Sequence, residues 1–265
     1  MRKARFIAVA VLAAFGVLAA VAFAGENQYN LTTTKVSPNG GTKKKPKPVG
    51  ITVNFSIKDA DGTIPDPVRD YSFSFEGVKV NTSVLPSCTA ASMNAAKSDS
   101  DCPSKAVWGT GSITARAGST DTPVDDPSAI KCNLDLKLYN SGTNKAALWL
   151  EGHPNGEPAQ CAVDINEAIP ATFKKKGANT VFTFRVPDSL LEQVTLPVAV
   201  IDVKTKIKKI KATGSKKKKV GYFVSTGCSD KKRDVSVIFA PGVQNGAGQP
   251  WSSGPEQTVK NTSSC

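Results

Sequence analysis

Six cysteines constrain the fold of this chain more than any other feature. They are Cys88, Cys102, Cys132, Cys161, Cys228 and Cys265. An even set of cysteines is typical of the disulfide framework of an exported protein. Several pairings are possible, and we expect the sequential one, 88–102, 132–161 and 228–265, because each bond then closes one local excursion of the chain. A zinc site is the weaker alternative, since the sequence has no Cys-x-x-Cys and a single histidine, His153.

The N-terminus has the pattern of a signal peptide. The basic residues 1–5, Met-Arg-Lys-Ala-Arg, precede an apolar run over residues 6–22, and Ala22 and Ala24 are the small residues of a cleavage site before Gly25. A retained membrane anchor is the alternative, since residues 6–24 are long enough to span a bilayer. We expect a signal peptide over 1–24, with no membrane span after its cleavage. An N-terminal edge strand with a Lys/Pro-rich loop follows over 25–48, and a β-sandwich domain over 49–265.

Alternation of apolar and polar residues predicts strands along most of the chain. The clearest case is residues 49–58, where Ile51, Val53, Phe55 and Ile57 fall on one face. Residues 130–139 and 145–151 predict a hairpin, and residues 187–192 are the best candidate for a helix. The fold class that we expect is all-β: a single antiparallel β-sandwich, immunoglobulin-like or jelly-roll-like, stapled by disulfides and with one or two short helical turns.

The segment over residues 85–117 is the most distinctive part of the expected domain. Cys88 and Cys102 enclose small and polar residues without an apolar run, and residues 109–114, Gly-Thr-Gly-Ser-Ile-Thr, then alternate as a strand does. We interpret this segment as a disulfide-stapled loop that opens into a core strand. It is a signal of architecture and points to no reaction.

Several short motifs resemble those of a set of uncharacterised exported β-sandwich proteins of actinobacteria. The matching features are Lys-Lys-Lys-Pro-Lys-Pro over 43–48, Asp61-Gly62, Asn81 ahead of a Pro-x-Cys88, Cys102-Pro-Ser-Lys with Gly109-Thr-Gly111, Tyr139-Asn140, Tyr222 ahead of Thr226-Gly-Cys228, and Cys265. The resemblance covers most of the chain from Lys43 onward. It implies export and a β-sandwich, and it carries over no catalytic or ligand-binding residue.

Lysine is unusually dense in this chain. The sequence has 34 Lys and Arg against 22 Asp and Glu, and residues 204–219 hold nine lysines in sixteen positions. These are Lys204, Lys206, Lys208, Lys209, Lys211, Lys216, Lys217, Lys218 and Lys219, and further clusters lie at 43–47, 174–176 and 231–233. One hypothesis is a surface that binds anionic polymers by counterion release. The alternative is a solvated strand face and hairpin tip, where lysine also discourages edge pairing.

Candidate catalytic and metal-binding residues are few. His153 lies in a turn-rich loop without a Gly-x-Ser-x-Gly nucleophile elbow elsewhere in the chain. Asp59 and Asp61 before Gly62 have the spacing of a short calcium loop, but the further ligands of an EF-hand are missing, and Asp and Gly also favour plain turns. We therefore expect no metal and no cofactor.

The carboxylates and tryptophans of the chain are compatible with a carbohydrate-active enzyme as an alternative function. A glycosidase needs two carboxyl groups at a set separation, and nothing in the sequence selects a pair. The candidates are Asp59, Asp61, Asp121, Asp125, Asp126, Glu151 and Glu157. Trp108, Trp149 and Trp251 are candidates for stacking on sugar rings, although single tryptophans more often pack in cores.

The function that we expect is non-enzymatic. The chain is predicted to be secreted or envelope-associated and to bind anionic envelope polymers through its lysine-rich strands. Specific nucleic-acid recognition is not expected, because arginine and aromatic residues are not interleaved with the lysines. The alternative is an extracellular carbohydrate-active hydrolase. A concave pocket with converging carboxylates favours the hydrolase, and a lysine-rich face without one favours the binding protein.

Overall fold

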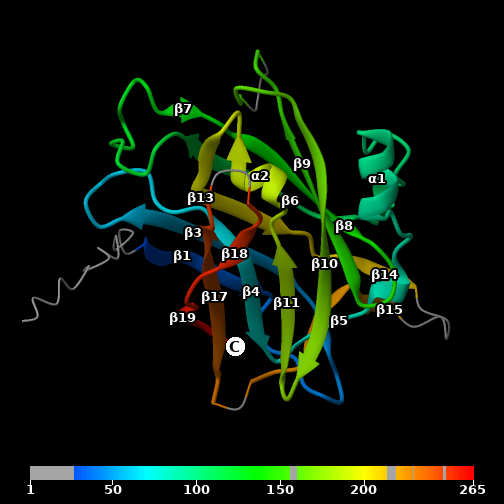
Figure 1. The fold of residues 1–265 in the computed structure, drawn as a ribbon. Helices are drawn as coiled ribbons and strands as arrows, with labels where there is room; N and C mark the ends of the chain where they lie inside the picture. Colours follow the sequence, from blue (N-terminus) through cyan, green and yellow to red (C-terminus); the bar gives the residue numbers. More distant parts are fainter. Residues whose placement is uncertain (1–26, 156–159, 214–218, 229, 247–248) are drawn as a thin grey trace, which may run out of the picture.

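The fold is antiparallel β-structure with two short helices (Figure 1). It is a computed structural model that describes residues 27–155, 160–213, 219–228, 230–246 and 249–265. The expected signal peptide, 1–24, lies outside the described residues, as do Glu157, Lys216, Lys217 and Lys218. The predicted all-β, disulfide-stapled class is confirmed.

Most described strands belong to one 14-stranded sheet. Its order is β1 (Asn27–Ser37), β3 (Gly50–Asp59), β13 (Leu196–Ile207), β6 (Val107–Ala117), β8 (Leu134–Asn140), β9 (Lys145–Gly152), β10 (Ile165–Lys176), β11 (Asn179–Arg185), β4 (Val68–Glu76), β17 (Lys232–Gln244) and β18 (Trp251–Ser253). Off this path, β7 (Ile130–Lys131) pairs with β6, β12 (Glu192–Gln193) with β13, and β19 (Gln257–Ser264) with β17. Two small sheets complete the fold. The first has two strands, β14 (Lys211–Thr213) and β15 (Lys219–Gly221). The second has three strands in the order β2 (Lys47–Pro48), β16 (Phe223–Ser225) and β5 (Val78–Val80).

The two ends of the large sheet meet, so one curled sheet forms both layers of the fold. The ring of Tyr29 on β1 stacks on Phe239 of β17, with centroids 4.4 Å apart. The side-chain amide of Asn261 on β19 donates to the carbonyl oxygen of Leu31 on β1 at 3.4 Å. The N-terminal strand, which we expected to be an edge, therefore pairs with β3 on one side and lies beside β19 on the other.

The inside of the curled sheet is the apolar core. The alternation predicted for residues 49–58 is observed, since Ile51, Val53, Phe55 and Ile57 of β3 are all buried. Phe55 contacts the ring of Phe239 edge-on at 5.4 Å, and further aromatic pairs continue across β4 and β11. Burial of apolar area on one face of each strand is what holds the curled sheet together.

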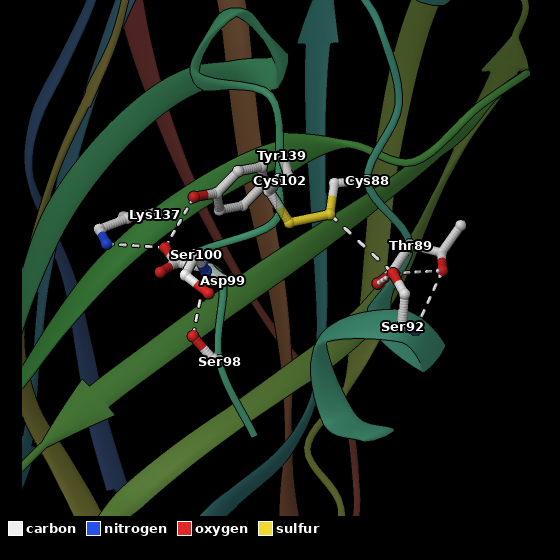
Figure 2. The surroundings of a disulfide bond; sticks show 9 residues. All are labelled: Cys88, Thr89, Ser92, Ser98, Asp99, Ser100, Cys102, Lys137 and Tyr139. Atoms are coloured by element: carbon white, nitrogen blue, oxygen red, sulfur yellow. Dashed lines mark hydrogen bonds and ion pairs between the residues drawn. A yellow bond between two sulfur atoms is a disulfide. The ribbon is translucent and has the colours of Figure 1, made fainter. Parts of the chain in front are cut away.

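A helix covers the outer face of β8, β9 and β10, where we had expected only a loop. This helix, α1 (Ala90–Ala96), begins at Thr89, whose side chain accepts a hydrogen bond from the Ser92 amide at 3.1 Å. Met93 is 1% exposed and packs with Trp149 over the sheet. Figure 2 shows that the Cys88–Cys102 disulfide lies beside this helix. The stapled segment is therefore a packed cover on the sheet.

The second helix is where the sequence predicted it. α2 (Asp188–Leu191) follows Pro187, and no side chain caps its first turn. Asp188 instead forms an ion pair with Arg69 at 3.2 Å and accepts a hydrogen bond from the Trp251 amide at 3.1 Å. Two 3-10 turns, η1 (Thr82–Val84) and η2 (Ser104–Ala106), flank the stapled segment.

The disulfides pair sequentially, as predicted: Cys88–Cys102, Cys132–Cys161 and Cys228–Cys265. The first holds the α1 segment and the last ties the C-terminus to the segment before β17. In the described part of the chain, no helix has the length and apolar character needed to cross a membrane.

Candidate functional site

Lysine segments that are distant in sequence converge at one end of the curled sheet. We call this the basic end. It is the end at which β1, β4, β10 and β13 finish and at which β3, β11 and β17 begin, in the lower part of Figure 1. The directions of the strands therefore bring loops that are distant in the sequence to the same end of the sheet.

The three-stranded sheet β2-β16-β5 organises the first part of the basic end. Lys47 on β2 pairs with Ser225 of β16, and Lys79 on β5 pairs with Val224 of the same strand. Segments 47–48, 78–80 and 223–225 therefore lie side by side. The residues before β2, 43–45, extend the lysine row into the adjoining loop.

Close backbone contacts join the other two clusters to this sheet. The Gly77 amide donates to the Ala178 carbonyl at 3.2 Å, beside the lysines of the β10–β11 tip. The Gly77 carbonyl accepts from the Thr226 amide at 2.7 Å. Gly77 has φ +60, and a Cβ there would lie 1.9 Å from the Gly227 carbonyl oxygen, so only glycine fits this crossing. The Arg233 guanidinium donates to Ser225 Oγ of β16 at 2.7 Å, which places the start of β17 at the same end.

The lysines of the basic end are exposed and face water. They are Lys43, Lys44, Lys45, Lys47, Lys79, Lys174, Lys175, Lys176, Lys208, Lys209, Lys211, Lys231 and Lys232. Among the described residues, no ion pair within 4.0 Å involves any of them. Acidic residues at this end are fewer, and are Glu76, Asp230 and Asp234. Like charges this dense repel one another, and a bound polyanion relieves that repulsion.

The lysines predicted as one surface over residues 204–219 fall into separate groups. Lys204 and Lys206 are exposed on the outer face of β13, where the ammonium of Lys204 lies 3.8 Å from Asp202. Lys208, Lys209 and Lys211 follow that strand and belong to the basic end. Lys219 begins β15, which pairs with β14 as the predicted hairpin.

Arg233 lies in the fourth basic cluster of the sequence but not on the surface. It is 0% exposed and donates to the Glu76 carbonyl at 2.9 Å and to Ser225 Oγ at 2.7 Å. Burial lowers the pKa of its guanidinium, and the charge of Glu76 opposes that shift. The period-two alternation of the strand indicates this burial, because Arg233 lies on the same face of β17 as the buried Val235 and Val237.

The opposite end of the sheet is rich in acidic turns. Their carboxylates are Asp59, Asp61, Asp66, Asp121, Asp125, Asp126, Asp164, Asp188 and Glu192. The turn after β3 and the loop after β6 lie together, since the Ile64 amide donates to the Thr122 carbonyl at 2.8 Å. The Asp59 carboxylate bonds within its own turn and accepts a hydrogen bond from the Asp61 amide at 2.8 Å. In the part of the chain that the structure describes, no three His, Cys, Asp or Glu side chains are arranged to hold a metal ion.

His153 is held between two carboxylates. Nδ1 lies 3.0 Å from Asp164 Oδ1, and Nε2 lies 3.4 Å from Glu151 Oε1. The hydrogen bond to Asp164, followed by that to Glu151, raises the pKa of the imidazole above its ordinary value. Glu151 also lies 3.7 Å from the Lys137 ammonium. Both ring nitrogens are thus engaged, which favours an ion-pair role over that of a general base.

Among the described residues, the tryptophans and the remaining candidate carboxylates form no open sugar-binding platform. Trp108, Trp149 and Trp251 are 1%, 1% and 7% exposed, so none offers a stacking face to solvent. Asp188, Glu192 and Trp251 line a shallow recess beside α2. Asp188 is engaged as described above, and Glu192 accepts a hydrogen bond from the Gln244 side chain at 2.8 Å.

In comparisons with known proteins, no protein-family model, no curated protein and no solved structure matches the chain. The resemblance to exported actinobacterial β-sandwich proteins accordingly rests on the short motifs themselves.

Proposed function

We propose that this protein is a non-enzymatic, extracytoplasmic binding protein that attaches to anionic polymers of the cell envelope through its basic end. The observation that supports this most is the convergence of four lysine segments at one end of the sheet, while acidic turns occupy the other. The resulting separation of charge orients the molecule toward a polyanion. The three disulfides are compatible with an oxidising compartment.

The type of ligand follows from the chemistry of the side chains. Lysine ammonium groups bind phosphates and carboxylates as point charges, without the planar bidentate geometry that arginine provides. The basic end is built almost entirely of lysine. A repeating anionic polymer is therefore a better ligand for it than one defined anion.

The test compares two triple variants with the same change in net charge. The basic-end variant carries Lys44→Gln, Lys175→Gln and Lys209→Gln, one from each of three segments. The control carries Lys58→Gln and Lys131→Gln, exposed at the opposite end, and Lys260→Gln, exposed in the middle of β19. Binding to polyphosphate and to heparin is measured between low and physiological salt.

The wild type is expected to lose affinity steeply with salt, and the basic-end variant to bind more weakly with a flatter salt dependence. Each lost contact reduces the slope by roughly 0.7–0.9 in a plot of log affinity against log salt. The control should keep the wild-type slope. Equal loss in both variants means that only net charge matters and rejects a site at the basic end. A third variant, Lys204→Gln with Lys206→Gln, reports whether the outer face of β13 takes part.

A carbohydrate-active hydrolase is the second candidate, favoured by the recess of Asp188, Glu192 and Trp251. The engaged carboxylates and the buried indole make this recess the weaker site. Release of reducing sugar from envelope polysaccharide by the wild type, and its loss in Glu192→Gln, would establish the hydrolase.

A further inference from the structure

We propose that the curled sheet binds a linear acyl chain inside it, with the mouth of the site beside α2. This inference is independent of the polyanion function, because the lining residues include none of the lysines.

The interior of the sheet holds a cavity of about 140 Å³. One buried water needs only ~10–15 Å³ measured in the same way, and an engineered apolar cavity of ~150 Å³ in another protein stays dry and binds benzene. Protein interiors are otherwise close-packed, with few voids larger than a water molecule. The space inside this sheet is therefore large enough for a ligand group.

The lining is apolar and contains no charged side chain. Aromatic and aliphatic residues of β3, β4, β6, β8, β9, β10, β11 and β13 form most of it, and its polar non-aromatic side chains are Thr180, Gln193 and Thr205. The Thr180 hydroxyl already donates to the Val78 carbonyl at 2.6 Å. Such an apolar surface gives water few hydrogen-bonding partners and favours contact with hydrocarbon.

The shape favours a linear ligand over a compact one. On β4 alone the lining runs from Val68 to Phe75, a span of roughly 23 Å at ~3.3 Å per residue. From this length of lining and the volume of about 140 Å³, we infer that the space is elongated and narrow. An extended acyl chain fits such a space better than a fused ring system does.

The mouth is at the α2 end. Leu190 and Leu191 of α2 line the cavity, and the half-buried lining residues Phe184, Val186 and Gln193 lie on the segments beside this helix. At the basic end, by contrast, lining residues such as Phe75, Trp108 and Phe223 are all buried. The chain terminus with its headgroup therefore stays at the α2 end, away from the lysines.

The turn that follows α2, beside the mouth, has an unusual backbone conformation. The loop that follows α2 places Val194 and Thr195 at φ +50 and +67, a conformation that β-branched residues rarely adopt. Val194 is also 73% exposed. Strained backbone of this kind is typical of functional segments.

The test is calorimetric titration of delipidated protein with dodecanoic acid, with its methyl ester, and with naphthalene as a compact probe. One dodecanoyl chain is expected to bind per molecule, and naphthalene to bind at least tenfold more weakly. Binding of both acid and ester assigns recognition to the chain, while binding of the acid alone assigns part of it to the carboxylate at the mouth. Absence of binding by acid and ester, or preference for naphthalene, overturns the proposal.

Two cavity-filling variants locate the site. Ala115→Leu and Thr205→Ile both add volume at lining positions, and each should weaken dodecanoate binding at least tenfold. The matched control, Ala95→Leu, lies exposed on α1 and should bind as the wild type does. If Ala115→Leu fails to fold, Thr205→Ile decides, since it keeps a β-branched residue in the strand. Wild-type affinity in a folded filling variant rejects the cavity as the site. The basic-end triple variant should also bind dodecanoate normally, so failure of one proposal does not imply failure of the other.

Discussion

The phenol of Tyr222 donates a hydrogen bond to the side-chain oxygen of Asn140, 82 positions earlier in the chain, at 3.2 Å. The amide nitrogen of Asn140 in turn donates to the carbonyl oxygens of Thr82, Leu85 and Pro86, each at 3.0 Å. Both side chains are buried, at 0% and 1% exposure. One asparagine therefore satisfies the backbone of the segment before Cys88 and joins it to β8 and to the segment between β15 and β16.

Replacing Tyr222 by Phe is expected to lower the free energy of unfolding by about 1–3 kcal/mol, because it leaves the Asn140 oxygen buried without a donor. Asn140→Asp should cost more, since a carboxylate would face three carbonyl oxygens. Denaturant unfolding measures both, with Tyr29→Phe as a control at a less buried hydroxyl. A loss below about 0.5 kcal/mol for Tyr222→Phe, the range of ordinary surface changes, would contradict this role.

Local pattern predicted the strands, while the disulfide pairing was one choice among several. Period-two alternation located β3, and the β14–β15 hairpin follows from Gly214 between two strand patterns. Sequential pairing of the cysteines is a choice of short loops, and it is confirmed. These features depend on neighbours in the sequence.

What sequence reasoning missed depends on tertiary contact. An isolated helix of the seven residues of α1 is unstable in water, where helices below ~12–15 residues are marginal. It exists because Met93 packs on the sheet and the Asn94 side chain bonds both backbone groups of Ala168. The basic end was missed for a related reason: alternation predicts a strand but neither its neighbours nor its direction in the sheet.

Arg233 should prove structural, unlike the exposed lysine before it. Arg233→Leu removes the guanidinium hydrogen bonds to the Glu76 carbonyl and to Ser225 Oγ, at a cost of about 1–3 kcal/mol in unfolding free energy. Lys232→Leu, the neighbouring exposed position, should change stability by less than about 0.5 kcal/mol. Similar losses in the two variants would mean that the buried guanidinium contributes no specific stabilisation. Thermal and denaturant unfolding provide the comparison.

The Cys88–Cys102 bond is expected to stabilise the α1 cover more than the curled sheet. Its reduction or replacement by a Ser pair should cost about 2–5 kcal/mol. Hydrogen exchange should show loss of protection at Met93 in the cover before any loss at β3 and β4. The Cys132–Cys161 pair, replaced in the same way, serves as a control outside the cover. Uniform loss of protection across the sheet would contradict an independent cover.

Asp99 couples the same cover to pH. Burial alone would raise the pKa of its carboxyl, but hydrogen bonds from Lys137 and Tyr139, each 2.7 Å long, hold the pKa below its ordinary value (Figure 2). A lowered folded-state pKa stabilises the fold above the unfolded value of ~3.9 and loses that effect as pH falls toward the folded value. The stability difference between wild type and Asp99→Asn should therefore be constant from about pH 5 to 7 and shrink below about pH 4. Asp101→Asn, exposed in the same loop, is the control for the loss of one carboxylate there.

His153 offers the most direct check on the electrostatics, because it is the chain's only histidine and gives a single imidazole C2–H resonance. Its pKa in the folded protein should exceed the ordinary ~6.5, since an imidazolium donates to both Asp164 and Glu151. A raised folded-state pKa means that the stabilisation is complete below ~6.5 and disappears as pH rises through the folded value. Asp164→Asn should lower the pKa more than Glu151→Gln, because Glu151 stands farther off and also faces Lys137. Asp121→Asn, in a separate loop, should leave the titration unchanged. A wild-type pKa at or below 6.5 would show that the two carboxylates do not hold the ring, and would return His153 to consideration as a free base.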